Sequence, residues 1–360
     1  MKPEITISNS SEEFPEFKLY SLVDATCELS PGSPNEYYSN GDYWWPDETK
    51  PDGLPYIRKD GDPYPGNFYA HRESMIKMAW LSSKLTLKFE QTKENQYAQQ
   101  AWEVLHHWFV NPATRMEPHL KYAQAIPGHC TGRGIGLIDT FHLVETTLTI
   151  RRLKQLDALD EEQFGALRDW FADYLQWFTT SEFGLKEKAE HNNHATYWHV
   201  QAAAFAILAE DQKILEMCRE GYKTILLPGQ MAEDGSFPHE IARTLPYHYS
   251  LFNLEGMAAL CHLLTTPEDN LFEFHTPKGL SLRNGIEFMY PYLRDKNSWP
   301  HTKDILHWDR RLNKQACLLF AGKAYKEDKY HDLWNTLPRL QWDFEAAGST
   351  LVKNHELWLV

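Results

Sequence analysis

The fold class is decided by two apolar runs that follow one another almost without a linker: "ATYWHVQAAAFAILAED" (residues 195–211) and "KILEMCREGYKTILL" (residues 213–227). Their apolar residues recur at spacings of three and four, which is typical of helices that pack through one face. A connection this short makes two helices antiparallel neighbours. The pair therefore predicts a helical hairpin.

Further segments with the same period extend from residue 71 toward the C-terminus. The longest are residues 135–153, 161–179, 250–264, 279–293 and 304–326. We count about nine helices or more by this period, with no convincing strand alternation and no fixed repeat length of the kind a solenoid needs. The sequence thus predicts an all-α protein, an incomplete (α/α) toroid or barrel of helical hairpins, in which residues 1–360 form a single domain. The last ten residues, 351–360, are compatible with a short strand or a helix end.

Residues 1–70 differ from the rest because they are rich in Pro, Gly, Asp and Tyr. This composition predicts an irregular N-terminal segment, and its aromatic residues indicate that it packs over or near the cleft. The first residues lack the apolar region of a signal peptide, so the chain is either cytoplasmic or has lost a leader. No stretch approaches the roughly 18 to 20 apolar residues that cross a bilayer, so we expect no membrane span.

Charge and cysteine content exclude several classes of protein. The formal net charge of −14 argues against nucleic acid as a partner, although a local basic groove can still hold an acidic ligand. The five cysteines form no C-x-x-C pair, which disfavours both a thiolate zinc site and a disulfide scaffold.

Four polar loops interrupt the helical pattern, at residues 40–48, 111–136, 188–198 and 233–254. In a toroid, the loops at one rim form the cleft, and long ordered loops in compact domains are usually functional. We therefore expect the site to be built from these loops.

The third loop contains "HNNHATYWH" (residues 191–199), with three histidines and two asparagines. Either Asn192 or Asn193 is a suitable N-cap for the next helix, which leaves the second asparagine and His194 unexplained. His191, His194 and His199 are separated by three and five positions, so the three side chains do not lie on one face of a helix. A metal site is therefore not expected.

The fourth loop contains "RTLPYHY" (residues 243–249). The guanidinium of Arg243 is a fork for a carboxylate, and a tyrosine can pass a proton in either direction when a cation lowers its pKa. Two alternatives stay open here. Arg243 could instead pair with a structural acid such as Glu240, and either Tyr247 or Tyr249 could be a core residue.

Four stretches, in this order, resemble the alginate lyase superfamily of helical-toroid polysaccharide lyases: "WFVNPATRMEPHLKYAQAIPG" (108–128), "GRGIGLIDT" (132–140), "NNHATYW" (192–198) and "DGSFPHEIARTLPYHYSLFNL" (234–254). The resemblance covers most of residues 35–265 and is closest to polysaccharide lyase family 38, which includes alginate and glucuronan lyases. It implies cofactor-free and metal-free β-elimination on a 1,4-linked polyuronate, which leaves a 4,5-unsaturated uronate at the new non-reducing end. It also implies a secreted or periplasmic location.

The same resemblance implies roles for the residues of the third and fourth loops. Asn193 and Arg243 are suited to neutralise the sugar carboxylate, and Tyr249 to protonate the leaving oxygen O4. Tyr247 is the alternative to Tyr249, because the segment after the arginine is one residue shorter than in related periplasmic enzymes. In mannuronate and glucuronate H5 and O4 lie on the same side, so one tyrosine can serve as base and acid. In guluronate H5 lies on the opposite face, and His194 is the candidate base.

Other residues are candidates for binding the neighbouring sugars. They are Gln124, His129 and Arg133 of the second loop, Tyr43, Trp44 and Trp45 of the first, and Tyr247 and His248 of the fourth. The first-loop aromatics fit a lid or stacking platform, with packing against the toroid as the alternative.

Two other function classes compete with the lyase. A non-catalytic protein that binds acidic glycans would use the same aromatics and arginine. A hydrolase with two carboxylates would have only Glu240 and Asp234 available in these loops. The preferred uronate, internal or terminal cleavage, and the oligomeric state stay open at this point.

Overall fold

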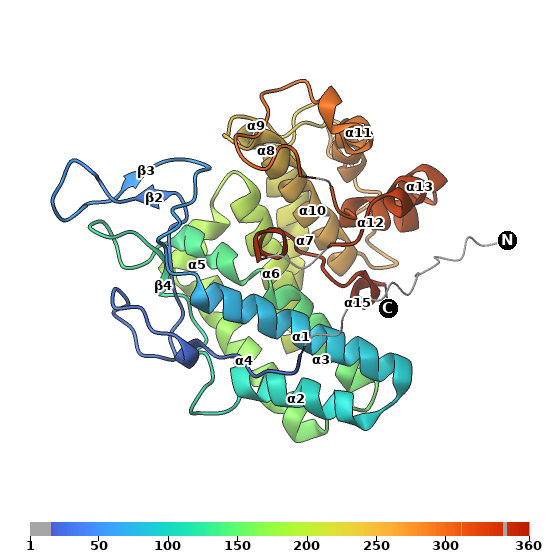
Figure 1. Ribbon diagram of the computed structural model, residues 1–360. Helices are drawn as coiled ribbons and strands as arrows, with labels where there is room; N and C mark the ends of the chain where they lie inside the picture. Colours follow the sequence, from blue (N-terminus) through green and yellow to red (C-terminus); the bar gives the residue numbers. More distant parts are fainter. Residues whose placement is uncertain (1–15, 311, 341–343, 360) are drawn as a thin grey trace.

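The computed structural model describes residues 16–310, 312–340 and 344–359 of the chain, and most of these are helical (Figure 1). The longer helices are α1 (Ala70–Thr92), α2 (Asn95–Phe109), α3 (Leu143–Gln155), α4 (Glu161–Thr180), α6 (Asn193–Ala209), α7 (Gln212–Gly221), α10 (Pro246–Leu264), α11 (Leu282–Arg294), α12 (Ala316–Tyr325) and α13 (Asp328–Thr336). The shorter ones are α5 (Glu182–Lys188), α8 (Leu227–Gln230), α9 (Pro238–Ile241), α14 (Phe344–Gly348) and α15 (His355–Trp358). The predicted all-α class is confirmed.

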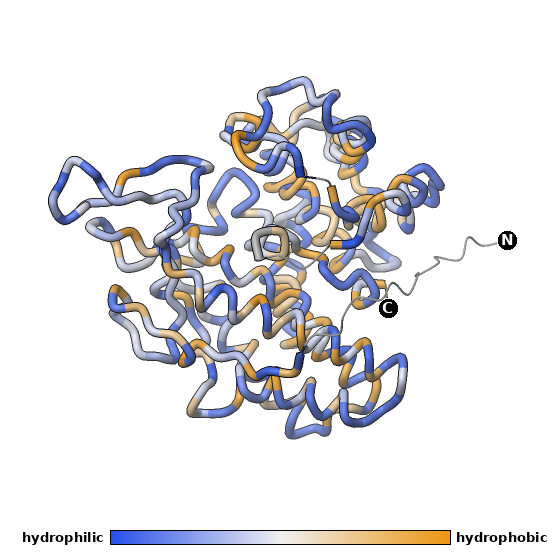
Figure 2. The backbone as a smooth tube through the Cα atoms, in the orientation of Figure 1, coloured by the Kyte–Doolittle hydropathy of each residue, from blue (hydrophilic) through white to orange (hydrophobic). Residues whose placement is uncertain are grey.

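Helix α6 lies at the centre of the molecule (Figure 1). It packs against α3, α4, α7 and α10. Nearly every residue from Asn193 to Leu208 is buried, as expected for a helix that is apolar on all sides. Figure 2 shows the same arrangement as hydrophobic colour along the inner helices and hydrophilic colour along many outer loops. The predicted hairpin of residues 195–227 is therefore present, with α6 in the core and α7, whose buried residues are Cys218 and Gly221, returning beside it.

Two predicted helices are wrong in extent. Residues 135–153 form a 3-10 helix, η2 (Gly134–Thr140), followed by α3. A Cβ atom added at Gly136 would lie 2.7 Å from the Cβ of Ala123. The backbone of η2 is therefore in close contact with the neighbouring loop, and this contact determines its conformation. Of residues 304–326, only α12 is helical, because the Asp304 carboxylate instead accepts the backbone N–H groups of Tyr247 and His248 at the start of α10.

Four short strands were missed by the sequence analysis. Strand β1 (Tyr38–Asn40) pairs in parallel with β4 (Tyr122–Ala125), and β2 (Trp44–Trp45) pairs antiparallel with β3 (Ile57–Arg58). Segments of two to four residues are too short for an alternating pattern to be visible. The expected irregular segment thus contains a small hairpin, and its residues 1–15 lie outside the described residues.

The C-terminal segment ends as a helix, α15, which packs against α1 and α3. The carboxylate of Glu145 holds it in place by accepting the backbone N–H groups of Lys353 and Asn354 at 2.7 and 2.8 Å and the indole N–H of Trp358 at 3.1 Å. All five cysteines are free. The described chain holds no helix both long and apolar enough to cross a bilayer.

Candidate active site

The loop before α6 ends in the predicted cap. The side chain of Asn192 accepts the backbone N–H of His194 at 3.1 Å, which satisfies one of the free donors of the first turn. Asn192 is therefore the cap, and Asn193 and His194 occupy the first turn of α6. Of the other two histidines, His191 is exposed and His199 is fully buried.

Asn193 is buried and bound to a carboxylate of the short helix α9. Its backbone N–H and its side-chain amide donate to the two oxygens of Glu240, at 2.6 and 2.8 Å. Burial raises the pKa of Glu240, although the two hydrogen bonds from Asn193 act in the opposite direction. An amide has two N–H donors and one oxygen acceptor, and Glu240 accepts from one of the two donors of the Asn193 side chain.

His194 contacts a second buried carboxylate. Its Nδ1 lies 2.8 Å from Oε1 of Glu187, the most deeply buried polar residue of α5. Burial alone would lower the pKa of His194, but the charge and hydrogen bond of Glu187, together with the charges of Glu190 and Glu240, raise this pKa above its ordinary value. The sequence analysis missed Glu187, because α5 and α6 are separate helices and no spacing rule connects a residue of one to a residue of the other.

Arg243 lies just before α10 and pairs with Asp60 of the N-terminal hairpin. Its Nε and Nη2 donate to the two oxygens of Asp60 at 3.1 and 2.9 Å. The expected alternative partner, Glu240, is instead occupied by Asn193. The guanidinium carbon of Arg243 lies 4.2 Å from the centre of the Tyr249 ring, a distance at which a cation is attracted to the ring face.

The hydroxyl of Tyr249 is hydrogen bonded to that of Tyr43, beside β2. Burial raises the pKa of Tyr249 well above its ordinary value, and the nearby Tyr43 adds to this, whereas the positive charge of Arg243 opposes it. The hairpin approaches closely here, because a side chain at Gly61 would collide with the hydroxyl of Thr244. Tyr43 and Asp60 thus bring the predicted first loop against the fourth.

Tyr247, the alternative to Tyr249, points elsewhere. Its hydroxyl donates to the carbonyl of Tyr292 at 3.1 Å, and its ring packs edge-on against Trp299 and Trp308. His248 lies beside Tyr249, with ring centres 5.5 Å apart, and burial lowers the pKa of His248 to about 4. Tyr247 is therefore a core residue, as expected of one of the two tyrosines.

Two candidates from the second loop, Gln124 and Arg133, bind each other. Gln124 Oε1 accepts from Nη2 of Arg133 at 3.0 Å, and its Nε2 donates to the buried Asp139 at 2.9 Å. Gln124 has a φ of +50°, a left-handed conformation that is costly for a residue with a side chain and is often found at functional sites. Because its side-chain amide already bonds both neighbours, the side chain serves to hold Arg133.

The remaining aromatic candidates separate into two groups. Trp44 faces Arg133, whose guanidinium carbon lies 5.9 Å from the ring, and exposed His129, with ring centres 5.3 Å apart. Trp45 is held within the hairpin, since its indole N–H donates to the carbonyl of Asp62 at 2.8 Å. The structure therefore brings Trp44, His129 and Arg133 together, and assigns Trp45 to packing.

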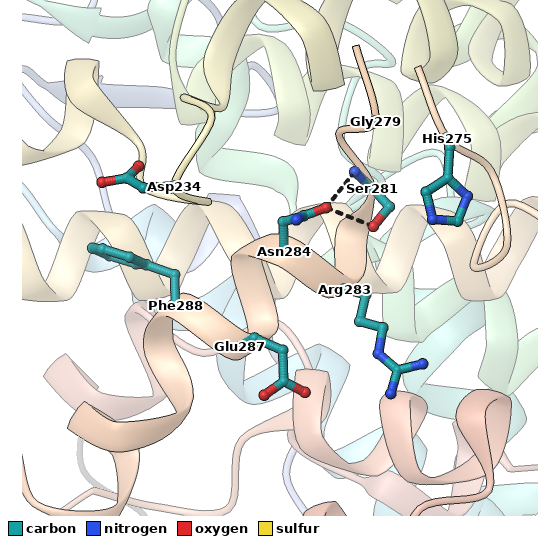
Figure 3. Close-up of a pocket in the computed structure, with 8 residues that line it drawn as sticks. All are labelled: Asp234, His275, Gly279, Ser281, Arg283, Asn284, Glu287 and Phe288. Carbon is teal, nitrogen blue, oxygen red and sulfur yellow. Dashed lines mark hydrogen bonds between the residues drawn. The ribbon is translucent and has the colours of Figure 1, made fainter. Parts of the chain in front are cut away.

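Two open pockets lie on the surface. One is lined by Arg133, Gly134, Ile135, Lys186, Ala189, Glu190 and His191, so it adjoins the loop that carries His194. The other lies along α11 and includes Asp234 (Figure 3). There, the backbone N–H and hydroxyl of Ser281 donate to Asn284 at 2.8 and 2.7 Å, and Arg283 pairs with Glu327. The α11 pocket is lined by none of Tyr249, Tyr43 and Arg243. Of the two acids considered for a hydrolase, Asp234 lines this pocket, whereas Glu240 accepts hydrogen bonds from Asn193.

Across the described residues, no group of three or more His, Cys, Asp or Glu side chains is arranged to hold a metal ion. The alginate lyase family model matches residues 22–299. The chain belongs to the alginate lyase family. This confirms the resemblance seen in the sequence and identifies the enzyme as a polysaccharide lyase.

Solved structures of alginate lyases share the fold. The crystal structure of an alginate lyase from Bacteroides ovatus is 29% identical, with 94% of this chain and 88% of that chain covered and a TM-score of 0.82. A variant of alginate lyase A1-III complexed with a tetrasaccharide is 13% identical, covers 96% and 91%, and has a TM-score of 0.60. Alginate lyase A1-III from Sphingomonas species A1 is also 13% identical, covers 87% and 85%, and has a TM-score of 0.51. The predicted toroid is confirmed by these structures. A comparison with curated proteins found no match.

Proposed function

We propose that this member of the alginate lyase family cleaves 1,4-linked polyuronate, with alginate as the first candidate, by β-elimination. The observation that carries this proposal is the Tyr249 ring packed against the guanidinium of Arg243 at 4.2 Å. Asn193 and His194 lie on the adjacent helix, and Glu240 connects them electrostatically to Arg243. A relative named as an alginate lyase at 29% identity supports the choice of substrate. Glucuronan, cleaved by the same chemistry, is the alternative.

The first requirement of the reaction is to neutralise the sugar carboxylate. H5 is very weakly acidic unless the charge of the adjacent C6 carboxylate is offset, because its removal creates a dianion. Asp60 uses Nε and Nη2 of Arg243, which leaves Nη1 as the donor for the substrate. The other amide N–H of Asn193 supplies a second hydrogen bond to the same carboxylate.

The second requirement is an acid at O4. Burial keeps the pKa of Tyr249 well above its ordinary value, so the phenol carries its proton at neutral pH and is able to donate it. As the base removes H5, the C5–H electron pair passes into the C6 carboxylate and gives the dianion. This pair then forms the C4–C5 double bond as the C4–O4 bond breaks with its electrons on O4, and Tyr249 protonates that oxygen.

The residue that acts as base depends on the configuration of the uronate at C5. For polyguluronate we assign His194, since H5 lies on the face opposite O4. For polymannuronate and glucuronan both atoms lie on one side, and we assign both roles to Tyr249. To act as base the phenol must first lose its proton, and the positive charge of Arg243, which acts against the effect of burial, favours that phenolate. Trp44, His129 and Arg133 bind the neighbouring sugars. A polymeric substrate of this kind fits a secreted or periplasmic enzyme.

A substrate panel tests the proposal. The purified protein is mixed separately with polymannuronate, polyguluronate and glucuronan, and the ultraviolet absorbance of the unsaturated product is followed with and without EDTA. A rise with at least one polymer, unchanged by EDTA, is the expected result. Binding of all three polymers without any rise would instead indicate a non-catalytic glycan-binding protein, and a rise abolished by EDTA would revive a metal-dependent mechanism.

A further inference from the structure

The carboxylate of Glu187 has one polar partner among the described residues. Oε1 of Glu187 lies 2.8 Å from Nδ1 of His194, and Oε2 is buried without a hydrogen-bond partner. The side chain is 0% exposed, whereas that of His194 is 17% exposed. His194 therefore joins a buried acid on one side to solvent on the other.

A buried carboxylate is costly to the fold unless its charge is compensated. Glu187 occupies the last turn of a seven-residue helix, where an apolar residue would fill the same space without this cost. Half of its hydrogen-bonding capacity is unused, so it is poorly explained as a structural clamp. Within the described parts of the chain, its contact with His194 is what accounts for a carboxylate at this position.

The contact also determines which nitrogen of His194 carries the proton. A carboxylate accepts hydrogen bonds, so in the neutral imidazole Nδ1 bears the proton and Nε2 bears the lone pair. A buried acid that orients a catalytic histidine in this way fixes its tautomer and stabilises the imidazolium that forms when it accepts a proton. His194 thereby has its basic nitrogen on the side away from Glu187.

The other charged groups near His194 act in the same direction. Glu187 reaches it from α5, Glu190 from the connecting loop and Glu240 from α9, and all three are acids that favour the protonated ring. The surroundings therefore strengthen His194 as a proton acceptor.

We propose that Glu187 is a positioning residue, which holds His194 in the tautomer whose Nε2 accepts H5 of guluronate. This inference rests on the proposed function, because it deepens the role of His194 in that reaction. It adds to the reaction a residue that does not contact the substrate.

The main test is Glu187→Gln, which keeps the shape of the side chain and removes its charge. A positioned base contributes about 10²- to 10⁴-fold to a rate, and we expect the variant to lose about 10- to 100-fold of kcat/KM on polyguluronate. The acidic limb of its pH–rate profile should move to lower pH, because His194 loses the carboxylate that raises its pKa. Glu190→Gln is the matched control, since Glu190 carries a like charge nearby without a hydrogen bond to the ring, and should keep most of the activity.

A double-mutant cycle separates positioning from general structural damage. In the His194→Ala background, Glu187→Gln should have no further effect on kcat/KM. A further loss there, or an unshifted pH profile in the single variant, would overturn the proposal. If Glu187→Gln does not fold, ¹⁵N NMR of the imidazole in the intact protein decides instead: Nδ1 must be the protonated nitrogen of neutral His194, and protonated Nε2 would refute the proposal.

Failure of this inference is distinguishable from failure of the proposed function. If His194→Ala cleaves polyguluronate at the wild-type rate, the assignment of the base is wrong, and the role of Glu187 falls with it. If His194→Ala loses this activity while Glu187→Gln keeps the wild-type rate and pH profile, His194 is the base without help from Glu187.

Discussion

Two tyrosines on the same helix provide a matched test of the catalytic assignment. Tyr249→Phe and Tyr247→Phe each remove one buried phenolic oxygen, two positions apart on α10. The first hydroxyl is bonded to Tyr43 under the hairpin, and the second donates to the carbonyl of Tyr292 in the core. The two substitutions are chemically identical, so any difference between them reports on position.

The expected effects differ in kind. On polymannuronate, Tyr249→Phe removes the group that serves as both base and acid and should lower kcat/KM by at least about 10²- to 10⁴-fold, or about 3 to 5 kcal/mol of transition-state stabilisation. Tyr247→Phe should leave kcat/KM within about threefold of wild type, because a core hydroxyl takes no part in the transition state. It should lower the free energy of unfolding by about 1 kcal/mol, since one buried hydrogen bond is lost and the carbonyl of Tyr292 is left without that donor.

Initial rates on polymannuronate, measured by ultraviolet absorbance of the unsaturated product, give the first quantity, and urea unfolding gives the second. A Tyr249→Phe variant that keeps more than a tenth of the wild-type kcat/KM would refute the acid role. Loss of activity in Tyr247→Phe with full activity in Tyr249→Phe would reverse the assignment and show that ring packing is a poor guide to this site.

Four further predictions follow from the site. His194→Ala should lose activity on polyguluronate and largely keep it on polymannuronate in the product assay; equal losses on both would remove the division of labour. Wild-type activity on polyguluronate should decline as the pH falls through the pKa of His194, which Glu187 raises above 6.5, because the base must be unprotonated; a flat profile between pH 5 and 8 would contradict this. Arg243→Lys should lower kcat/KM by about 100-fold, since an ammonium cannot hold Asp60 and the substrate through one planar fork, and initial-rate kinetics would show it. Asn192→Ala should reduce the free energy of unfolding by about 1 kcal/mol through loss of the helix cap, with a urea midpoint equal to that of wild type as the contrary outcome.

The helices and their order could be predicted from the sequence, because they depend on local physics. The apolar residues along residues 195–227 predict two helices, and the short connection makes these helices neighbours. The cap at Asn192 depends on contacts within two positions. Asn193, His194 and Arg243 could be singled out as polar residues beside apolar runs, whereas their roles in one site were implied by the resemblance to the alginate lyase superfamily.

The partners of those residues were decided by the tertiary structure alone. Arg243 and Asp60 are separated by 183 positions, and Tyr249 and Tyr43 by 206, so no local pattern connects them. The choice between Tyr247 and Tyr249 also needed the fold, because one hydroxyl meets Tyr292 and the other meets the hairpin. Helical period extends only over neighbours three and four positions apart. A site built from several loops of a toroid therefore becomes visible only when the helices that carry those loops have packed.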